Sequence, residues 1–353
     1  MSNENNISLV VEKIFKNNTN NYIFIYSPPK VGSTTLVSSL RISLGKLYNI
    51  IHIHDEVMLT VLTGITNISV NDIINHLSII GKNVFVFDIY RSPIERKIST
   101  FFEKLSPYHF NNTQQNINKY SIDRISNRFN KLFPHIEIDD YYFDRYNITP
   151  LSTFDFEKKY TIQKVKNIHY VKLRLCDSQL WGNILSTILN QDIIIISDYQ
   201  TEQKEIGELY NKFKTEYKLP KNFFEIIQND KYLKIYYTLD EQTKYLNLWK
   251  LKLERDYTPY TLQEYTFYMQ LCLENKHIND IQYEHYIDNG CGCKLCSIER
   301  RKIFCKVKKG EKILNKIVHR QVARTAIMNK LTVNNVLSSN KYEKNLFTLN
   351  KIN

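Results

Sequence analysis

A short turn with one lysine carries the clearest sign of chemistry in this sequence. The turn at residues 27–33 follows an apolar run at 22–26 and precedes a helical pattern from residue 34 to about residue 44. The N-terminus of a helix offers unpaired N–H groups, and its dipole favours negative charge. A glycine in the turn lets the backbone approach an anion closely, and a lysine adds a full positive charge. We therefore predict a phosphate- or sulfonate-binding loop formed by Lys30, Val31, Gly32, Ser33, Thr34 and Thr35.

A second candidate anion site follows the apolar run at 84–87. Arg91 lies just before Pro93, a residue that suits the first turn of a helix. Arg96 and Ser99 are three residues apart within that predicted helix, so their side chains share one face. Both candidate sites thus follow a predicted strand and open a helix. For Arg96, a salt bridge on the helix surface is an equally good interpretation.

Together the two stretches resemble the nucleotide-binding motifs of the sulfotransferases that use 3′-phosphoadenosine 5′-phosphosulfate (PAPS). The order Lys30-Val-Gly-Ser-Thr-Thr resembles their 5′-phosphosulfate loop. The pattern Arg91-x-Pro-x-x-Arg-x-x-Ser99 resembles their 3′-phosphate motif, in which the Arg and the Ser hold the 3′-phosphate. The resemblance implies PAPS as the cofactor, with Lys30 and the loop N–H groups stabilising charge on the leaving bridge oxygen.

A looser similarity extends over roughly residues 20–250, through stretches such as Tyr142-Phe-Asp-Arg and Tyr236-Tyr-Thr. In this respect the chain resembles sulfotransferase-like capsular polysaccharide synthesis proteins, which implies an acceptor hydroxyl on a carbohydrate. The Arg-Lys-Gly-x-x-Gly segment of cytosolic aryl sulfotransferases is not found near the C-terminus. The last part of the nucleotide clamp therefore has no assigned residues.

Sulfuryl transfer to a hydroxyl also needs a base for the acceptor proton. Candidates lie at the end of a strand pattern at 50–54, where alternation places His52 and His54 on the same face. Imidazole titrates near neutral pH, which suits base work. We expect His54 to be the base because it is nearer the carboxyl end of the strand, with His52 and Glu56 as rivals. One histidine could instead be a packing residue, and Glu56 could only begin the next helix.

Two other functions remain open from the sequence. A P-loop kinase acting on a nucleotide or small molecule would need Gly-x-x-x-x-Gly-Lys-Ser/Thr, whereas here the lysine precedes the glycine. Asp88 follows an apolar run, as a Walker B aspartate does, but many buried strands end in this way. The second alternative is a non-catalytic protein that binds nucleic acid or another partner through a basic C-terminal tail.

The C-terminal region differs from the remainder in charge. Residues 291–353 contain 15 Lys and Arg against 3 Asp and Glu, whereas the first 290 residues contain 33 of each. The stretch at 298–333 mixes basic and apolar residues, which suits amphipathic helices for an anionic partner or a solvated appendage. A nearby cysteine cluster could hold structural Zn²⁺ or remain a set of reduced thiols. It consists of Cys291, Cys293, Cys296 and Cys305.

The elements that must position these residues alternate between strands and helices. This order predicts an α/β fold, a P-loop-like three-layer sandwich with a central parallel sheet and a helical, basic C-terminal appendage. Ligands in such sheets bind beyond the carboxyl ends of the strands. The polar, Asn-rich stretch at 105–135 is expected to be loop and short helix, and the apolar stretch at 192–197 a strand or the approach to a loop. We predict a polar segment at 1–20, a sulfotransferase-like domain at 21–260 and a Cys-containing basic region at 261–353. Without a long apolar run or a signal-peptide pattern, and with clustered cysteines, we expect a cytoplasmic or otherwise intracellular protein with no transmembrane segment.

Overall fold

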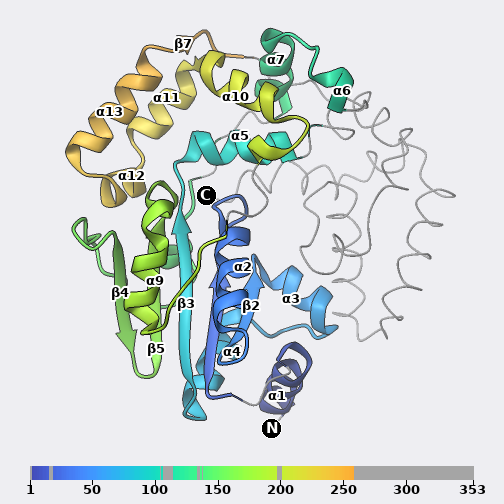
Figure 1. Cartoon of the computed structure of the whole chain (residues 1–353), viewed down its shortest axis with the longest axis vertical. Coiled ribbons are helices and arrows are strands. Elements are labelled where there is room, and N and C mark those ends of the chain that lie inside the picture. The colour runs from blue at the N-terminus through green and yellow to red at the C-terminus, as the bar shows by residue number, and fades with distance from the viewer. Residues whose placement is uncertain are drawn as a thin grey trace, which may run out of the picture.

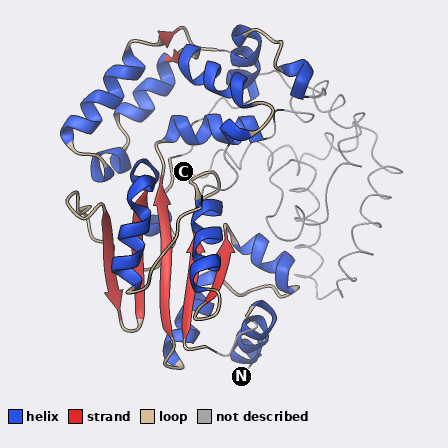
Figure 2. Ribbon diagram, in the orientation of Figure 1, coloured by secondary structure: helices blue, strands red, loops and turns tan. Residues whose placement is uncertain are grey.

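The computed structural model of the chain is a mixed α/β protein with one central, mostly parallel sheet (Figure 1, Figure 2). The structure describes residues 2–15, 19–103, 105, 114–132, 136, 138–196 and 201–257. Five strands lie in the order β2-β1-β3-β5-β4, and within this sheet β4 runs antiparallel to β5. The strands are β1 (Asn21–Tyr26), β2 (Asn49–Ile53), β3 (Asn83–Tyr90), β4 (Tyr160–Val165) and β5 (Ile168–Arg174).

The central strands β1 and β3 contain continuous apolar runs because both faces of the sheet are covered. Ile23, Phe24 and Ile25 of β1 are all fully buried, although successive side chains of a strand point to opposite faces. Ile25 belongs to one core cluster and Phe24 to another. A strand buried on both faces gives a continuous apolar run rather than alternation, which is typical of parallel sheets.

Each face of the sheet carries its own helices. On one face, Leu40 of α2 (Ser33–Leu44) and Leu185 of α9 (Trp181–Leu189) share a core cluster with Ile25. On the other face, Ile73 of α4 (Val70–Ile79) shares a cluster with Phe24. The parallel pairings of β1 with β2, of β1 with β3 and of β3 with β5 confirm a central sheet that is mostly parallel. The second face also carries α1 (Ser2–Ile14), α3 (Glu56–Thr63) and α8 (Tyr141–Asp144).

A helical cap lies beyond the carboxyl ends of the parallel strands, at the top of Figure 1. Its core joins helices far apart in the sequence, for example through Phe102, Phe129 and Phe213, whose rings are in contact. The helices of this part are α5 (Pro93–Glu103), α6 (Gln114–Ile117), α7 (Ile122–Leu132), α10 (Gly207–Glu216), α11 (Lys221–Gln228), α12 (Lys231–Tyr236) and α13 (Leu239–Lys250). Two short strands, β6 (Leu219–Pro220) and β7 (Leu253–Glu254), pair within it.

Several predicted elements differ from the structure in extent. β3 continues to Tyr90, so Asp88 lies inside the strand rather than after it. The stretch at 105–135, expected to be loop and short helix, contains the 11-residue α7. β4 was not expected as a strand, and the apolar stretch at 192–196 has no regular structure.

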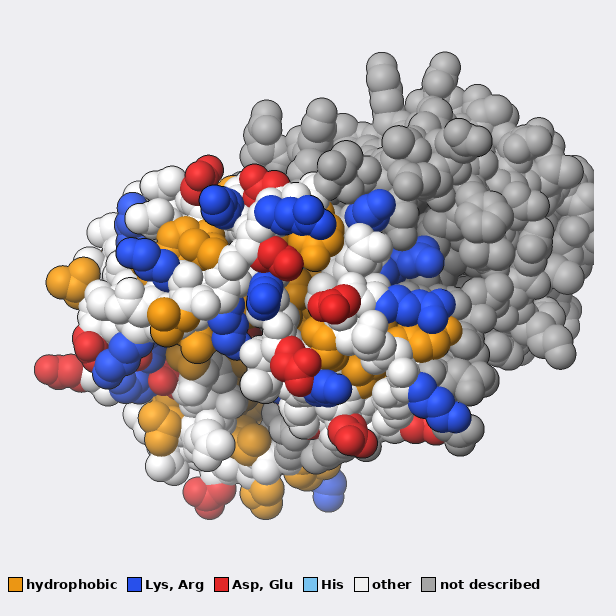
Figure 3. All heavy atoms as spheres, turned by 90° about the horizontal axis from the view of Figure 1, so that it is seen from above, with side chains coloured by type: hydrophobic (Ala, Val, Ile, Leu, Met, Phe, Trp, Pro, Cys, Tyr) orange, Lys and Arg blue, Asp and Glu red, His pale blue; other side chains and the backbone are white. Residues whose placement is uncertain are grey.

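The described part of the chain carries a mixed surface charge. Figure 3, seen from the side of the helical cap, shows Lys and Arg interspersed with Asp and Glu. The predicted region at 261–353, with the cysteine cluster and the basic tail, lies outside the described residues. Among the helices that the structure does describe, none is long and apolar enough to cross a membrane.

Candidate functional site

The two predicted anion motifs lie at the place where the strand order of the sheet reverses. From β1 the chain passes to β2 on one side and then to β3 on the other side of β1. In open α/β sheets, the crevice beyond the carboxyl ends of such strands is the usual ligand site. The loop at 27–32 follows β1, and Arg91 follows β3. The two loops are in contact, because Arg91 Nη1 donates a hydrogen bond of 2.8 Å to the carbonyl oxygen of Lys30.

The loop after β1 has an unusual backbone. Lys30 has a φ of 67° and Gly32 a φ of 90°, both in the left-handed region. Gly32 is the N-cap of α2, and no side chain caps this helix. A Cβ on Gly32 would lie 2.6 Å from Cδ1 of Leu175 and 3.4 Å from the ring of Trp181. The backbone conformation and the packing therefore both require glycine here. The uncapped first turn of α2, formed by Ser33, Thr34 and Thr35, begins directly after it.

The side chain of Lys30 is held within the helical cap. Its Nζ lies 3.1 Å from Oε1 of Glu103, the last residue of α5, and the two side chains are 13% and 30% exposed. A second lysine, Lys204, lies near enough that burial and the charge of Lys30 lower the pKa of Lys204. Arg91 Nη2 is 3.5 Å from the hydroxyl of Tyr210 on α10. Positive groups from the loops after β1 and β3 and from the cap thus gather at this edge.

The helical part of the second motif is buried rather than exposed. Arg96 and Ser99 are 7% and 4% exposed. Arg96 Nη1 lies 2.5 Å from Oδ1 of Asp139, so the salt-bridge interpretation describes a contact that is present, although it is not on the surface. A role of Arg96 and Ser99 in holding a 3′-phosphate stays a prediction.

The two histidines at the carboxyl end of β2, His52 within the strand and His54 directly after it, have different environments. His54 Nδ1 lies 2.7 Å from the carbonyl oxygen of Ser27, which can only accept, so we assign the proton to Nδ1. In the neutral ring the lone pair is then on Nε2. His52 is buried, its Nε2 has no hydrogen-bond partner, and its ring lies 4.4 Å from that of His54. Burial, followed by the charges of His54 and Arg41, lowers the pKa of His52 well below its ordinary value. This favours His54 over His52 as a proton acceptor.

Glu56, the third candidate base, is the first residue of α3, after the N-cap Asp55. Its Oε1 accepts a hydrogen bond of 2.9 Å from the hydroxyl of Tyr26, and its Oε2 lies 3.9 Å from Nη1 of Arg145. Burial and the charge of Glu56 raise the pKa of Tyr26. Glu56 thus begins a helix, as one interpretation of the sequence expected, and it also holds a buried tyrosine.

A buried group of charges escaped the sequence analysis. Lys172 Nζ, on β5, lies 2.6 Å from Oδ2 of Asp88 and also contacts Oδ2 of Asp140. All three side chains are buried. Burial and the charge of Asp140 raise the pKa of Asp88, which Lys172 opposes. A signal was present in the sequence, because a lysine in the strand pattern Tyr170-Val-Lys-Leu is costly to bury without acidic partners.

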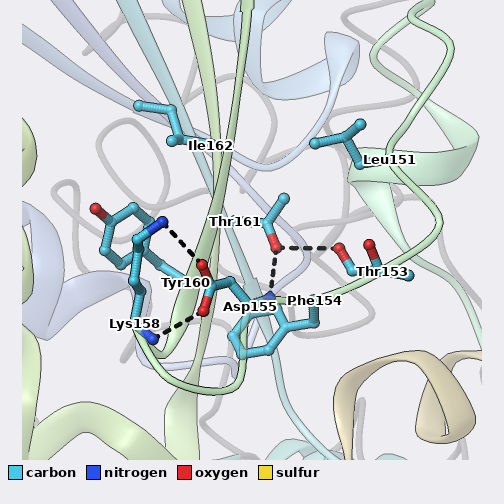
Figure 4. A pocket seen from close by; sticks show the side chains of 8 residues that line it. All are labelled: Leu151, Thr153, Phe154, Asp155, Lys158, Tyr160, Thr161 and Ile162. Carbon is cyan, nitrogen blue, oxygen red and sulfur yellow. Dashed lines mark hydrogen bonds and ion pairs between the residues drawn. The ribbon is translucent and has the colours of Figure 1, made fainter.

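A separate cavity of about 370 Å³ lies beside β4, at the opposite edge of the sheet from β2 (Figure 4). Thr161 joins its walls, since its hydroxyl accepts from the N–H of Asp155 and donates to the carbonyl of Thr153. No predicted site residue lines this cavity. Its lining consists of Leu151, Thr153, Phe154, Asp155, Lys158, Tyr160, Thr161 and Ile162.

Comparison of the chain with protein-family models, with curated proteins and with solved structures gave no match. The geometry of the site is therefore the basis on which a function is proposed. Within the described residues, no group of three or more His, Cys, Asp and Glu could hold a metal ion. The predicted zinc ligands lie outside those residues.

Proposed function

We propose that this chain is a sulfotransferase, which moves a sulfuryl group from PAPS to a hydroxyl of a carbohydrate. The observation that carries the proposal is the contact between the two motifs, in which the Arg91 guanidinium bonds to the Lys30 carbonyl at the carboxyl edge of β1 and β3. Two sequence motifs that resemble halves of one nucleotide clamp are thus neighbours in the fold, although they are 61 residues apart.

The loop after β1 fits the phosphosulfate end of the nucleotide. A P-loop-like turn, with Gly32 in the left-handed region and an uncapped helix N-terminus, offers N–H donors to an anion. PAPS supplies the activated sulfuryl group. Lys30 stabilises the negative charge that develops on the bridging oxygen, and the hydroxyls of the first turn of α2 add donors. Arg91 fits the 3′-phosphate, because guanidinium groups bind phosphate oxygens in pairs.

His54 accepts the proton of the acceptor in this proposal. The Ser27 carbonyl fixes the proton on Nδ1, so the lone pair that takes the proton of the acceptor hydroxyl is the one on Nε2. The acceptor oxygen forms a bond to sulfur while the bond between sulfur and the bridging oxygen of the 5′-phosphate breaks. The acceptor proton passes to His54, and the bridging oxygen leaves with the electron pair. His52 and Glu56 remain candidates for the same role.

The P-loop kinase stays the alternative proposal, and the contacts of Asp88 do not favour it. Asp88, the residue that resembled a Walker B aspartate, is fully buried and bound to Lys172. Its other contacts in this region include the N–H of Tyr142, at 3.0 Å from Oδ2. A thermal-shift comparison of 3′,5′-ADP with ATP and Mg²⁺ separates the two functions. The alternative of a partner-binding basic tail concerns residues outside those described.

Calorimetric binding of 3′,5′-ADP, followed by transfer assays with PAPS and a panel of sugars, tests the proposal. We expect Lys30→Ala to abolish transfer with little loss of fold, and Arg91→Ala chiefly to weaken nucleotide binding. Lys166→Ala is a matched control, since Lys166 also has a positive φ, of 53°, but is exposed in the turn between β4 and β5. Unchanged sulfuryl transfer in Lys30→Ala would refute the mechanism.

A further inference from the structure

One short segment contacts the predicted base, the second anion motif and the end of the strand that leads into the first anion motif. Residues 139–146, which we call the strap, cross the carboxyl edge of the sheet through α8. In chain order the strap contacts α5, then β5, then the end of β2, and finally the end of β1. These contacts are Asp139 with Arg96, Asp140 with Lys172, Tyr141 with His54, and Tyr146 with Tyr26.

The strap is anchored by the buried charges on β3 and β5. Asp140 contacts Lys172, and Asp88 accepts from the backbone N–H of Tyr142 over 3.0 Å. The hydroxyl of Tyr236 donates to Oδ1 of Asp140 over 3.1 Å. A buried network in which charged groups bond to one another and to backbone N–H groups holds its members in one arrangement. The residue between the two anchors, Tyr141, is therefore fixed in place.

Tyr141 reaches from the strap to the predicted base. Its hydroxyl donates a hydrogen bond of 2.6 Å to the backbone carbonyl of His54. His54 follows the last residue of β2, and the pairing of β1 with β2 ends at Ile53. The ring of the same histidine bonds to the Ser27 carbonyl through Nδ1. One bond holds the backbone and the other holds the ring, so the direction of Nε2 is set by both.

We propose that Tyr141 is a positioning residue that aims the His54 ring at the acceptor hydroxyl. The inference rests on the proposed function insofar as it takes His54 as the base. Loss of the Tyr141 hydroxyl frees the backbone at the end of β2 and lets the ring leave the Ser27 carbonyl. The proton then exchanges between Nδ1 and Nε2, and the lone pair no longer faces one direction. The nucleotide loops after β1 and β3 keep their contacts.

The chain offers a closely matched pair of variants for this test. Tyr141→Phe removes the hydroxyl and keeps the ring, which packs 5.1 Å from the ring of Tyr26 and under the guanidinium of Arg145. Tyr142→Phe removes the neighbouring hydroxyl, which donates to Gln163 on β4, away from His54. Both changes delete one tyrosine hydroxyl of the strap. Only the first touches the histidine.

The experiment uses the full chain and ¹⁵N-histidine NMR, with the His54 signals assigned from their loss in His54→Gln. We expect wild type and Tyr142→Phe to show the Nδ1–H tautomer, and Tyr141→Phe to show averaged nitrogen shifts. In transfer assays Tyr141→Phe should lower kcat about tenfold, because small errors of alignment are costly. Its affinity for 3′,5′-ADP should stay within about twofold of wild type.

Equal effects of the two variants on the His54 signals, or no effect of Tyr141→Phe, overturn the proposal. A changed tautomer with unchanged kcat also overturns it. A wild-type chain that binds no 3′,5′-ADP refutes the proposed function and with it the catalytic part of the inference. In that case the NMR comparison still decides whether Tyr141 holds the ring, so the two failures are distinguishable.

Discussion

Replacing Glu103 by glutamine should tighten binding of 3′,5′-ADP. The carboxylate of Glu103 lies 3.1 Å from Lys30 Nζ, in the loop that we expect to bind the 5′-phosphosulfate. An anion at this loop must compete with Glu103 for the lysine, and it is also repelled by the carboxylate. Glu103→Gln keeps the shape of the side chain and removes both effects.

Two unit charges at this separation interact by about 5 kcal/mol at an effective dielectric constant of about 20. The Glu103 side chain is 30% exposed, so water screens the pair, and pairs of this kind are worth about 1 kcal/mol net. About 1 kcal/mol corresponds to roughly a fivefold gain in affinity. The gain should shrink when the salt concentration rises from 0.15 M to about 0.5 M, because the interaction is electrostatic.

Isothermal titration of 3′,5′-ADP into the full chain measures this change. Glu225→Gln is the control, since Glu225 is an exposed residue of α11 and its substitution changes the net charge by the same amount. A general effect of net charge would move both variants equally. Affinity that is unchanged or weaker in Glu103→Gln would show that the nucleotide does not use Lys30, and it would refute a nucleotide site at this loop.

Three further predictions concern stability, and each is checked by urea unfolding. Gly32→Ala should lower the free energy of unfolding by about 1–3 kcal/mol, because the φ of 90° strains any other residue and Leu175 must move to admit the Cβ. A variant as stable as wild type would show that this position does not require glycine. Lys172→Met should lower the free energy of unfolding by about 3–5 kcal/mol, because it leaves two buried carboxylates without their cation. An unchanged free energy of unfolding would show that the charges are not buried. Burial lowers the pKa of His52, so below about pH 6.5 the unfolded chain binds a proton that the folded chain does not. The contribution of His52 to the free energy of unfolding is therefore complete above that pH. Below it, the free energy of unfolding should fall by up to about 1.4 kcal/mol per pH unit, and His52→Phe should remove this dependence.

The strands that are buried on both faces, and the loops that follow them, could be predicted from the sequence. Continuous apolar runs at β1 and β3 predict a covered parallel sheet, and parallel strands bring their carboxyl ends to one edge. The contact between Arg91 and Lys30 is a consequence of that arrangement. β4 was missed because it is an edge strand in which Ile162 and Val165 are exposed, so its sequence lacks a clear buried pattern.

The partners of the site residues could not be predicted in the same way. Glu103 reaches Lys30 from the end of α5, and Asp140 reaches Lys172 from a segment 32 residues earlier in the chain. These contacts depend on how the cap and the strap pack over the sheet. No local sequence pattern predicts that packing. α7 was underestimated for a related reason. Its mostly polar sequence hides three buried apolar residues at helical spacing, Ile122, Ile125 and Phe129.

Lys30, Arg91 and Arg96 are the three positively charged residues predicted to bind the nucleotide. Their present contacts indicate how readily each could bind a phosphate instead. Arg91 donates to the Lys30 carbonyl and to the Tyr210 hydroxyl, which are neutral oxygens, so a phosphate can replace them at small electrostatic cost. Lys30 must give up a half-buried carboxylate, which costs more. Arg96 is the most buried of the three and is bonded to Asp139, so a phosphate would have to displace this carboxylate to reach the guanidinium. Arg91 should therefore contribute most to nucleotide affinity, whereas Arg96 acts on the strap through Asp139.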